Sequence, residues 1–192
     1  MLENTVNQPE ESRPVYNGFA DVEKHWARNE IEAMKKKGII MGVSDTRFEP
    51  DVAIERAAIA AIVARMINEE KGNAEVSFKD VTDGAWYSEY VEIVASSGIM
   101  TGNENFFYPE RTITREEMAK VVAEFCGFEK ASNLDKEKFS DSDSISEWAG
   151  AYVNACVDKG IMKGYEDNSF RPSEKLTRAE AAVIFYRALE LK

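Results

Sequence analysis

Three arginines at equivalent places in the sequence could bind an anion. Arg56, Arg115 and Arg178 each follow a proline by six residues, and each lies in the first turn of a predicted helix. The helix dipole opposes a cation there and favours an anion. A guanidinium fork beside the free N–H groups of a helix N-terminus suits a carboxylate or a phosphate. We therefore predict an anion site at each arginine. The alternative is an internal ion pair with the aspartate of a nearby Phe-x-Asp motif, and the two can coexist.

Other residues recur in step with these arginines, which indicates that the chain is built from three repeats. Each repeat opens with Phe-x-Asp, continues with a tryptophan, and has one glycine 12 residues after that tryptophan and a second glycine four residues later. The openings are 59 and 61 residues apart. The recurring residues are Asp21, Asp80 and Asp141; Trp26, Trp86 and Trp148; and, as the second glycine, Gly42, Gly102 and Gly164.

Two of these residue types have competing interpretations. The second glycine can belong to a turn after a helix C-cap, or it can let the backbone approach a ligand closely. The tryptophans are favoured as anchors that pack the first helix on the core, and the alternative is that they stack on a sugar ring. The first glycine, such as Gly160, is predicted to end a helix as a left-handed residue.

Each repeat is predicted to consist of a helix, a loop and a second helix. The first helix runs from near the tryptophan to the first glycine, because apolar residues from 148 to 157 follow helical spacing. The second helix begins just before the arginine, where Thr114 with Glu117 and Thr177 with Glu180 fit a capping box. No long strand signal is present. The predicted fold class is therefore mostly α, with three helix-loop-helix units that share one core.

The variable stretches lie between the repeats and before the first one. Residues 1–18 contain two prolines and few apolar side chains, and are interpreted as a tail or linker. Residues 69–77 and 129–138 are polar and charged, and are interpreted as connectors. The predicted repeats span 19–70, 78–128 and 139–191, and form one cooperative unit.

Composition excludes several kinds of function. The net charge of −11 argues against nucleic acid or an anionic membrane bound through a broad basic face. One histidine and two cysteines exclude a His/Cys zinc cluster, and the acidic loops at Asp45 and Asp167 lack a twelve-residue calcium pattern. No apolar run is long enough for a membrane span. Threefold repetition argues against a single catalytic centre, so we expect neither an enzyme nor a bound metal or cofactor.

The repeated motifs resemble those of the S-layer homology (SLH) family, as a tandem trio over about residues 19–191. The resemblance rests on Phe-x-Asp, the tryptophan, the Gly-Ile-x-x-Gly segment, Ile-Thr-Arg-Glu-Glu at 113–117 and Leu-Thr-Arg-Ala-Glu at 176–180. It implies a pseudo-threefold spindle, in which one helix from each repeat enters a central three-helix bundle and grooves lie between the repeats. It also implies that the trio acts as a monomer.

The resemblance further implies a role at the surface of a Gram-positive-type bacterium. Such trios anchor surface proteins noncovalently to secondary cell wall polysaccharide, typically at a terminal N-acetylmannosamine that carries a pyruvate ketal. By position, the three arginines correspond to the family's ligand-contacting arginine. The three aspartates support the grooves, and the second glycines allow close approach. The alternative function is a helical protein–protein interaction module, and a wall-active hydrolase is a third, less favoured one.

The first repeat departs from the pattern at its second helix. It reads Ile54-Glu55-Arg56-Ala57-Ala58, where a threonine precedes the arginine in the other two repeats and a glutamate follows two residues after it. The loss of a capping box costs about 1 kcal/mol, and Glu55 adds a negative charge next to Arg56. We therefore predict that the groove that uses Arg56 binds more weakly than the best of the others.

Overall fold

The computed structural model describes residues 18–67, 77–129, 135 and 137–192. The predicted tail 1–18 and the predicted connector 69–77 lie outside these residues except for one residue each, and of the predicted connector 129–138 only residues 129, 135, 137 and 138 are described. The described residues contain no strand, only four isolated bridges and helices. The predicted mostly α class is therefore confirmed.

Each repeat contributes one short and one long α-helix. Short 3-10 turns precede the first and last short helices, at Ala20–Val22 and Ser142–Ser144. The short helices are α1 (Arg28–Lys36), α3 (Ser88–Ser96) and α5 (Gly150–Asp158), and the long helices are α2 (Arg56–Ile67), α4 (Arg115–Cys126) and α6 (Arg178–Glu190).

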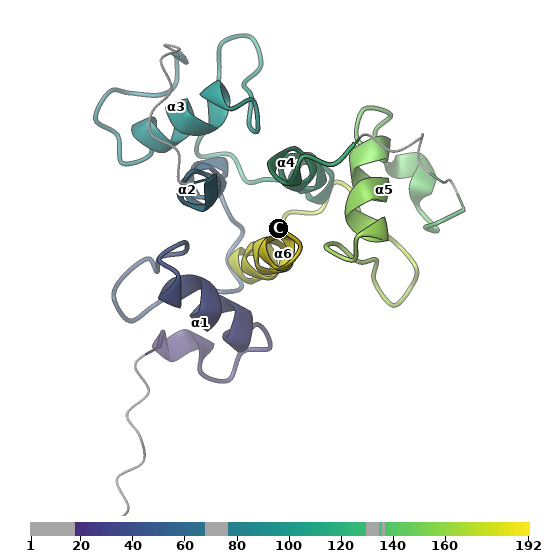
Figure 1. The fold of residues 1–192 in the computed structure, drawn as a ribbon, viewed down its shortest axis with the longest axis horizontal. Coiled ribbons are helices and arrows are strands. Elements are labelled where there is room, and N and C mark those ends of the chain that lie inside the picture. Colours follow the sequence, from purple (N-terminus) through teal and green to yellow (C-terminus); the bar gives the residue numbers. More distant parts are fainter. Residues whose placement is uncertain (1–17, 68–76, 130–134, 136) are drawn as a thin grey trace, which may run out of the picture.

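The long helices gather at the centre of the molecule and the short helices lie around them (Figure 1). Each short helix packs against the long helix of the preceding repeat: α3 on α2, and α5 on α4. Helix α1 of the first repeat packs on α6 of the last repeat. These contacts therefore form a closed cycle. Such a cycle is what the expected spindle requires, and its threefold symmetry stays a prediction.

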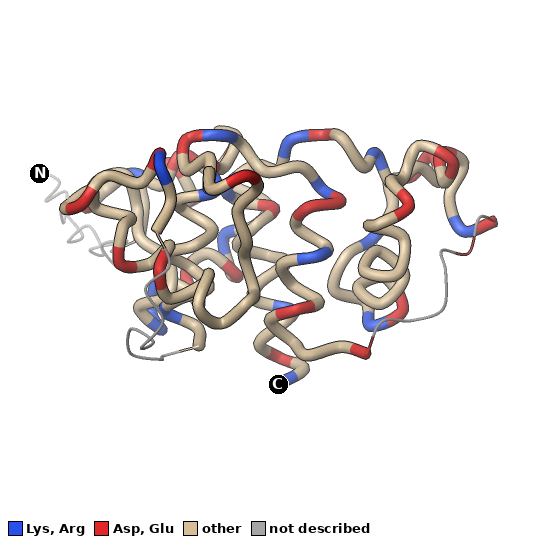
Figure 2. Tube along the Cα trace, turned by 90° about the horizontal axis from the view of Figure 1, so that it is seen from above, with Lys and Arg blue, Asp and Glu red and all other residues tan. Residues whose placement is uncertain are grey.

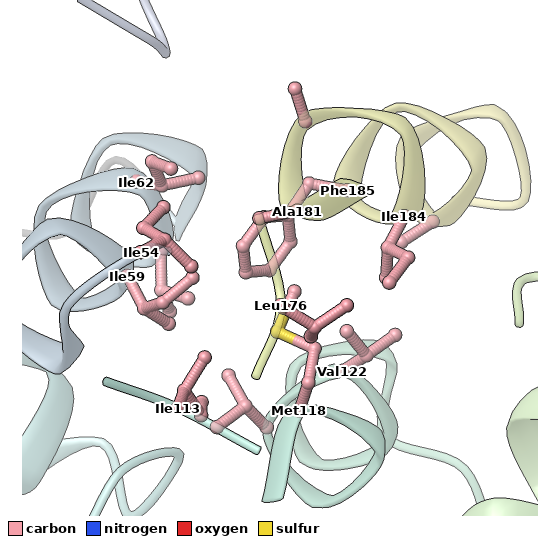
Figure 3. Close-up of a cluster of buried hydrophobic side chains, with 14 of the residues drawn as sticks. Ile54, Ile59, Ile62, Ile113, Met118, Val122, Leu176, Ala181, Ile184 and Phe185 are labelled. Atoms are coloured by element: carbon pink, nitrogen blue, oxygen red, sulfur yellow. The ribbon is translucent and has the colours of Figure 1, made fainter. Parts of the chain in front are cut away.

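Three backbone hydrogen bonds close the same cycle at the start of the long helices. Ile54 N–H donates to Leu176 O (2.9 Å), Ile113 N–H donates to Ile54 O (3.1 Å), and Leu176 N–H donates to Ile113 O (3.2 Å). The side chains of these three residues are buried. In Figure 3 they lie among apolar side chains from all three long helices. Because all three long helices begin at this ring, their N-termini lie at one end of the molecule.

The helix ends agree with their sequence signals. Gly38, Gly98 and Gly160 follow the short helices with φ of +71°, +75° and +71°, as predicted for left-handed residues after a helix. Both predicted capping boxes are present at α4 and α6. Helix α2 has Ala58 at the equivalent of the box glutamate, so it cannot form that box.

Charged residues of both signs are spread over the molecule (Figure 2). In this view neither the basic nor the acidic residues gather on one side. Within the described ranges, no helix combines the length and the apolar character that crossing a membrane would require. The search for groups of three or more metal-binding side chains likewise finds none among these residues.

Candidate functional site

Three grooves lie at the boundaries between repeats, and each is built by all three repeats. One repeat supplies a loop and its long helix, the following repeat supplies a tryptophan, and the preceding repeat supplies an arginine. We name them groove A (helix α2, Trp86, Arg178; about 550 Å³), groove B (helix α4, Trp148, Arg56; about 490 Å³) and groove C (helix α6, Trp26, Arg115; about 180 Å³).

Each of the three arginines ties its own helix to the loop of the following repeat. In groove B, Arg56 Nε donates to Phe107 O (2.9 Å) and Nη2 donates to Thr101 O (3.1 Å). The same pair of bonds recurs at the other two boundaries, so the arginines act as staples between repeats. The equivalent bonds are Arg115 to Phe170 O and Lys163 O (2.8 and 2.9 Å), and Arg178 to Phe48 O and Met41 O (2.7 and 2.9 Å).

The helix N–H groups beside these arginines are not free. Arg56 N–H donates to Arg111 O (2.9 Å) and Ala57 N–H donates to Pro109 O (2.9 Å). The first two N–H groups of α4 and α6 are used in the same way, by carbonyls of the repeat that follows in the cycle. The expectation of free N–H groups is therefore wrong, because neighbouring repeats satisfy them. An anion in a groove would meet the guanidinium, whose Nη1 takes no part in the staple.

The repeated aspartates shape the loop that receives each arginine. Asp80 accepts from Phe107 N–H (2.8 Å) and Tyr108 N–H (2.7 Å), and Asp21 and Asp141 do the same in their own repeats. No ion pair joins these aspartates to the three arginines in the described part of the chain, so the ion-pair alternative is wrong. Instead, the aspartate accepts from the N–H of a loop residue and the arginine donates to the carbonyl of the same residue, as at Phe107.

Burial and hydrogen bonding set the protonation of these groups. Desolvation lowers the pKa of Arg56 and of Arg178, but an arginine stays charged because its ordinary pKa is so high. Desolvation works to raise the pKa of Asp21, and the N–H groups of Phe48 and Glu49 outweigh it, so the pKa is lowered. Groove A therefore contains a charged guanidinium, Arg178, and the charged Asp21 helps to position the loop that it contacts.

The three tryptophans are exposed, by 65% at Trp26, 61% at Trp86 and 49% at Trp148. The favoured interpretation as core anchors is wrong. In the first repeat Ala27, Ile31 and Met34 form the buried stripe at i, i+4 and i+7, and the tryptophan is one position out of phase with it. This phase could have been found in the sequence. The large ring is left facing a groove that belongs to the preceding repeat.

The second glycines allow a close approach within the protein itself. A Cβ on Gly102 would lie 2.3 Å from Phe78 Cε1 and 2.5 Å from Phe106 O. At Gly42 and Gly164 the nearest atoms are likewise a loop carbonyl and the phenylalanine ring of the Phe-x-Asp motif. These glycines let the loop fold over that ring, and the loop forms part of each groove wall.

Sequence reasoning missed several groove residues on the long helices. Arg65 and Arg187 stand nine residues after the stapling arginine, and each donates from Nη1 to a carbonyl of its own repeat, Ile39 O and Ile161 O (both 3.2 Å). Their shared position, nine residues after the stapling arginine, is the signal by which the sequence could have revealed them. Lys120 lines groove B and has no equivalent in the other repeats, so repetition could not reveal it.

Comparison with known proteins agrees with the repeat structure. A family model described as the S-layer homology domain matches residues 18–60, 77–119 and 138–182, which is more than half of the chain. The chain belongs to the SLH family. Its three matched segments each contain one short helix and the start of one long helix. The repeat boundaries beyond these segments stay predictions.

The relatives are longer proteins that contain a similar SLH region. The chain is 35% identical over 175 residues to an amylopullulanase of Thermoanaerobacterium thermosulfurigenes (90% of this chain, 9% of the relative). It is 31% identical over 169 residues to a surface-layer 125 kDa protein of Lysinibacillus sphaericus (86% and 14%). It is 32% identical over 151 residues to a cellulosome-anchoring protein of Acetivibrio thermocellus (74% and 33%). The chain thus spans about a third or less of these relatives.

The departure in the first SLH repeat affects a different groove from the one predicted. Glu55 and Ala58 line groove A, which holds Arg178. The side chain of Arg56 reaches groove B instead. The altered residues and Arg56 were predicted to share one groove, because spacing within a repeat does not show that each arginine reaches the groove of the following repeat. Any effect of the departure is therefore expected at groove A.

Proposed function

We propose that this chain is a noncatalytic cell-wall anchor that binds secondary cell wall polysaccharide in the grooves between its SLH repeats. The names of two relatives, a surface-layer protein and a cellulosome-anchoring protein, support this role. They also support a location at the wall of a Gram-positive-type bacterium. The single observation that carries the proposal is the exposure of a tryptophan in every groove, beside a charged arginine from another repeat.

The ligand is a polymer terminus of N-acetylmannosamine with a pyruvate ketal. The carboxylate of the ketal binds the Nη1 edge of Arg56, Arg115 or Arg178, because charge-assisted bonds to a guanidinium are strong and directional. The sugar face stacks on the tryptophan. The aspartates and the second glycines act indirectly, because they fix the conformation of the loop to which each arginine donates its hydrogen bonds.

Binding in this way depends on short-range contacts. The net charge of −11 opposes the approach of an anionic polymer, and salt screens this long-range repulsion first. Affinity is therefore expected to rise modestly with added salt. A steep fall in affinity with salt would indicate a broad electrostatic contact instead.

A pull-down with purified wall polymer tests the proposal. The chain should bind native polymer and lose this binding when the pyruvyl groups have been removed. Retention of a protein partner without polymer binding would support the alternative, a protein–protein interaction module. Release of sugar fragments would show a hydrolase. Either result would overturn the proposal.

A further inference from the structure

Groove A is chemically unlike the other two grooves. Met41, Val43 and Val52 line it together with Trp86, and each of these four side chains is about half or more exposed. Exposed apolar side chains gathered in one concave place mark a binding surface more often than scattered ones do. The apolar character is therefore a property of this groove and needs its own explanation.

The corresponding positions in the other repeats are mostly polar or charged. Counting from the first glycine and from the proline, the residues equivalent to Met41, Val43 and Val52 are Thr101, Asn103 and Arg111 in the second repeat, and Lys163, Tyr165 and Glu174 in the third. On the long helix, Ala58 replaces the capping-box glutamate and Ala61 stands where groove B has Lys120. The same scaffold thus carries an apolar patch at one of its three sites, beside two acidic and two basic side chains.

Groove B also carries more positive charge than groove A does. Groove B contains Arg56, Arg111 and Lys120 against one acid, Glu117, which is paired with Arg111 at 2.6 Å. Lys120 makes no ion pair within the described residues. A carboxylate in groove B would therefore meet Lys120 in addition to the Nη1 edge of the stapling Arg56.

In groove A both arginines already donate hydrogen bonds within the protein, and acidic side chains line the same groove. Arg65 donates to Ile39 O and to Tyr90 Oη (3.2 and 3.1 Å) and lies over the Tyr90 ring. Arg178 shares the groove with Glu49 and Glu55. A carboxylate placed there would face two guanidiniums that already donate to carbonyls, beside Glu55 and beside Glu49, which is paired with Arg47 at 3.1 Å. It would also lose the solvation that it had in water.

We propose that groove A binds an uncharged N-acylated sugar unit of the wall polymer, while groove B takes the charged terminus. The sugar face packs on Trp86 and the acyl methyl group packs on Val43 and Val52. This assignment rests on the proposed polysaccharide binding and specifies how it is divided between sites. One chain would then hold both the terminus and a neutral unit of a polymer.

Because the chain has three tryptophans and each lines a different groove, fluorescence can report on one groove at a time. Trp26→Phe with Trp148→Phe leaves Trp86 as the reporter of groove A. Trp26→Phe with Trp86→Phe leaves Trp148 as the reporter of groove B. The probes are the methyl glycoside of N-acetylmannosamine and the same glycoside with the pyruvate ketal, which differ only in the charged group.

The Trp86 reporter should bind the two probes with affinities within about twofold of each other. The Trp148 reporter should bind the neutral probe at least about tenfold more weakly, the loss expected for one charge-assisted hydrogen bond. A Trp86 reporter that binds only the charged probe, or neither probe while Trp148 responds, would overturn the assignment and leave the proposed function standing. No response at any tryptophan to either probe would contradict both.

A substitution provides a second, independent test. Val52→Arg introduces at an exposed position the residue that groove B has there, without the glutamate that pairs with it. At the Trp86 reporter, the ratio of the charged-probe affinity to the neutral-probe affinity should then rise about two- to fivefold, because the lost contact of Val52 with the acyl methyl group affects both probes alike. Equal changes for both probes would show that the lining does not select by charge, and would overturn the assignment.

Discussion

Removal of one stapling arginine should weaken the whole fold. Arg115 is buried and donates to Phe170 O and Lys163 O at 2.8 and 2.9 Å. Arg115→Ala would leave both carbonyls without this donor. Hydrogen bonds from charged groups contribute about 1.5–3 kcal/mol each, so two of them predict a loss of about 3–6 kcal/mol in the free energy of unfolding. This is a large share of the 5–15 kcal/mol that is typical of a domain.

Urea denaturation followed by circular dichroism measures this loss. Arg47→Ala is the matched control, because Arg47 is exposed and its ion pair with Glu49 spans repeat 1 alone, so it should cost less than about 1 kcal/mol. Arg115→Lys should lie between them, since an ammonium cannot span both carbonyls in a fork. If Arg115→Ala costs no more than Arg47→Ala, the arginine is not a staple and its role as an inter-repeat contact is refuted.

Three further results are expected. Gly102→Ala should destabilise the chain by about 1–3 kcal/mol in the same denaturation assay, since the new Cβ would overlap Phe78; an unchanged midpoint would contradict the tight loop. The pKa of Asp21 is lower in the folded chain than its ordinary value, so the charged carboxylate stabilises the fold at higher pH. Stability should therefore fall as the pH drops from the ordinary pKa through the folded-state pKa, and Asp21→Asn should flatten this pH dependence. Glu55→Thr with Ala58→Glu should restore the capping box of α2 and add about 0.5–2 kcal/mol, and a lower melting temperature would contradict it.

The local structure of each repeat was predictable from short-range signals. The left-handed Gly160 and the capping box of Thr177 and Glu180 depend on residues within one helical turn. Both depend only on a short stretch of sequence. The left-handed glycine recurs in all three repeats and the capping box in two. The number of repeats and the mostly α class followed from the same regularity.

The assembly of the grooves was not predictable in the same way. Spacing within a repeat does not say which repeat an arginine contacts, and Arg178 bonds to Met41, 137 residues away. The tryptophan interpretation was wrong because large aromatic residues are usually counted as core, whereas Ala27 fills that place. The predicted free N–H groups were likewise occupied by another repeat. The errors about the arginine grooves and the N–H groups come from interactions between repeats, whereas the tryptophan error lies within one repeat.

These contacts also affect how binding should be tested. Substitution of Arg56, Arg115 or Arg178 by alanine would disturb both the fold and the ligand contact, so a loss of binding would not identify the site. The tryptophans are exposed, and their substitution removes a groove surface with little effect on the core. Tryptophan variants therefore separate binding from stability.

Titration calorimetry with purified native wall polymer tests the central claim most directly. The intact chain is compared with the variant Trp26→Ala, Trp86→Ala and Trp148→Ala, after thermal unfolding has shown that the two melt at similar temperatures. If the grooves between repeats bind the polymer, the intact chain gives a saturable binding heat and the triple variant gives none. Unchanged polymer binding by the folded triple variant would contradict the account.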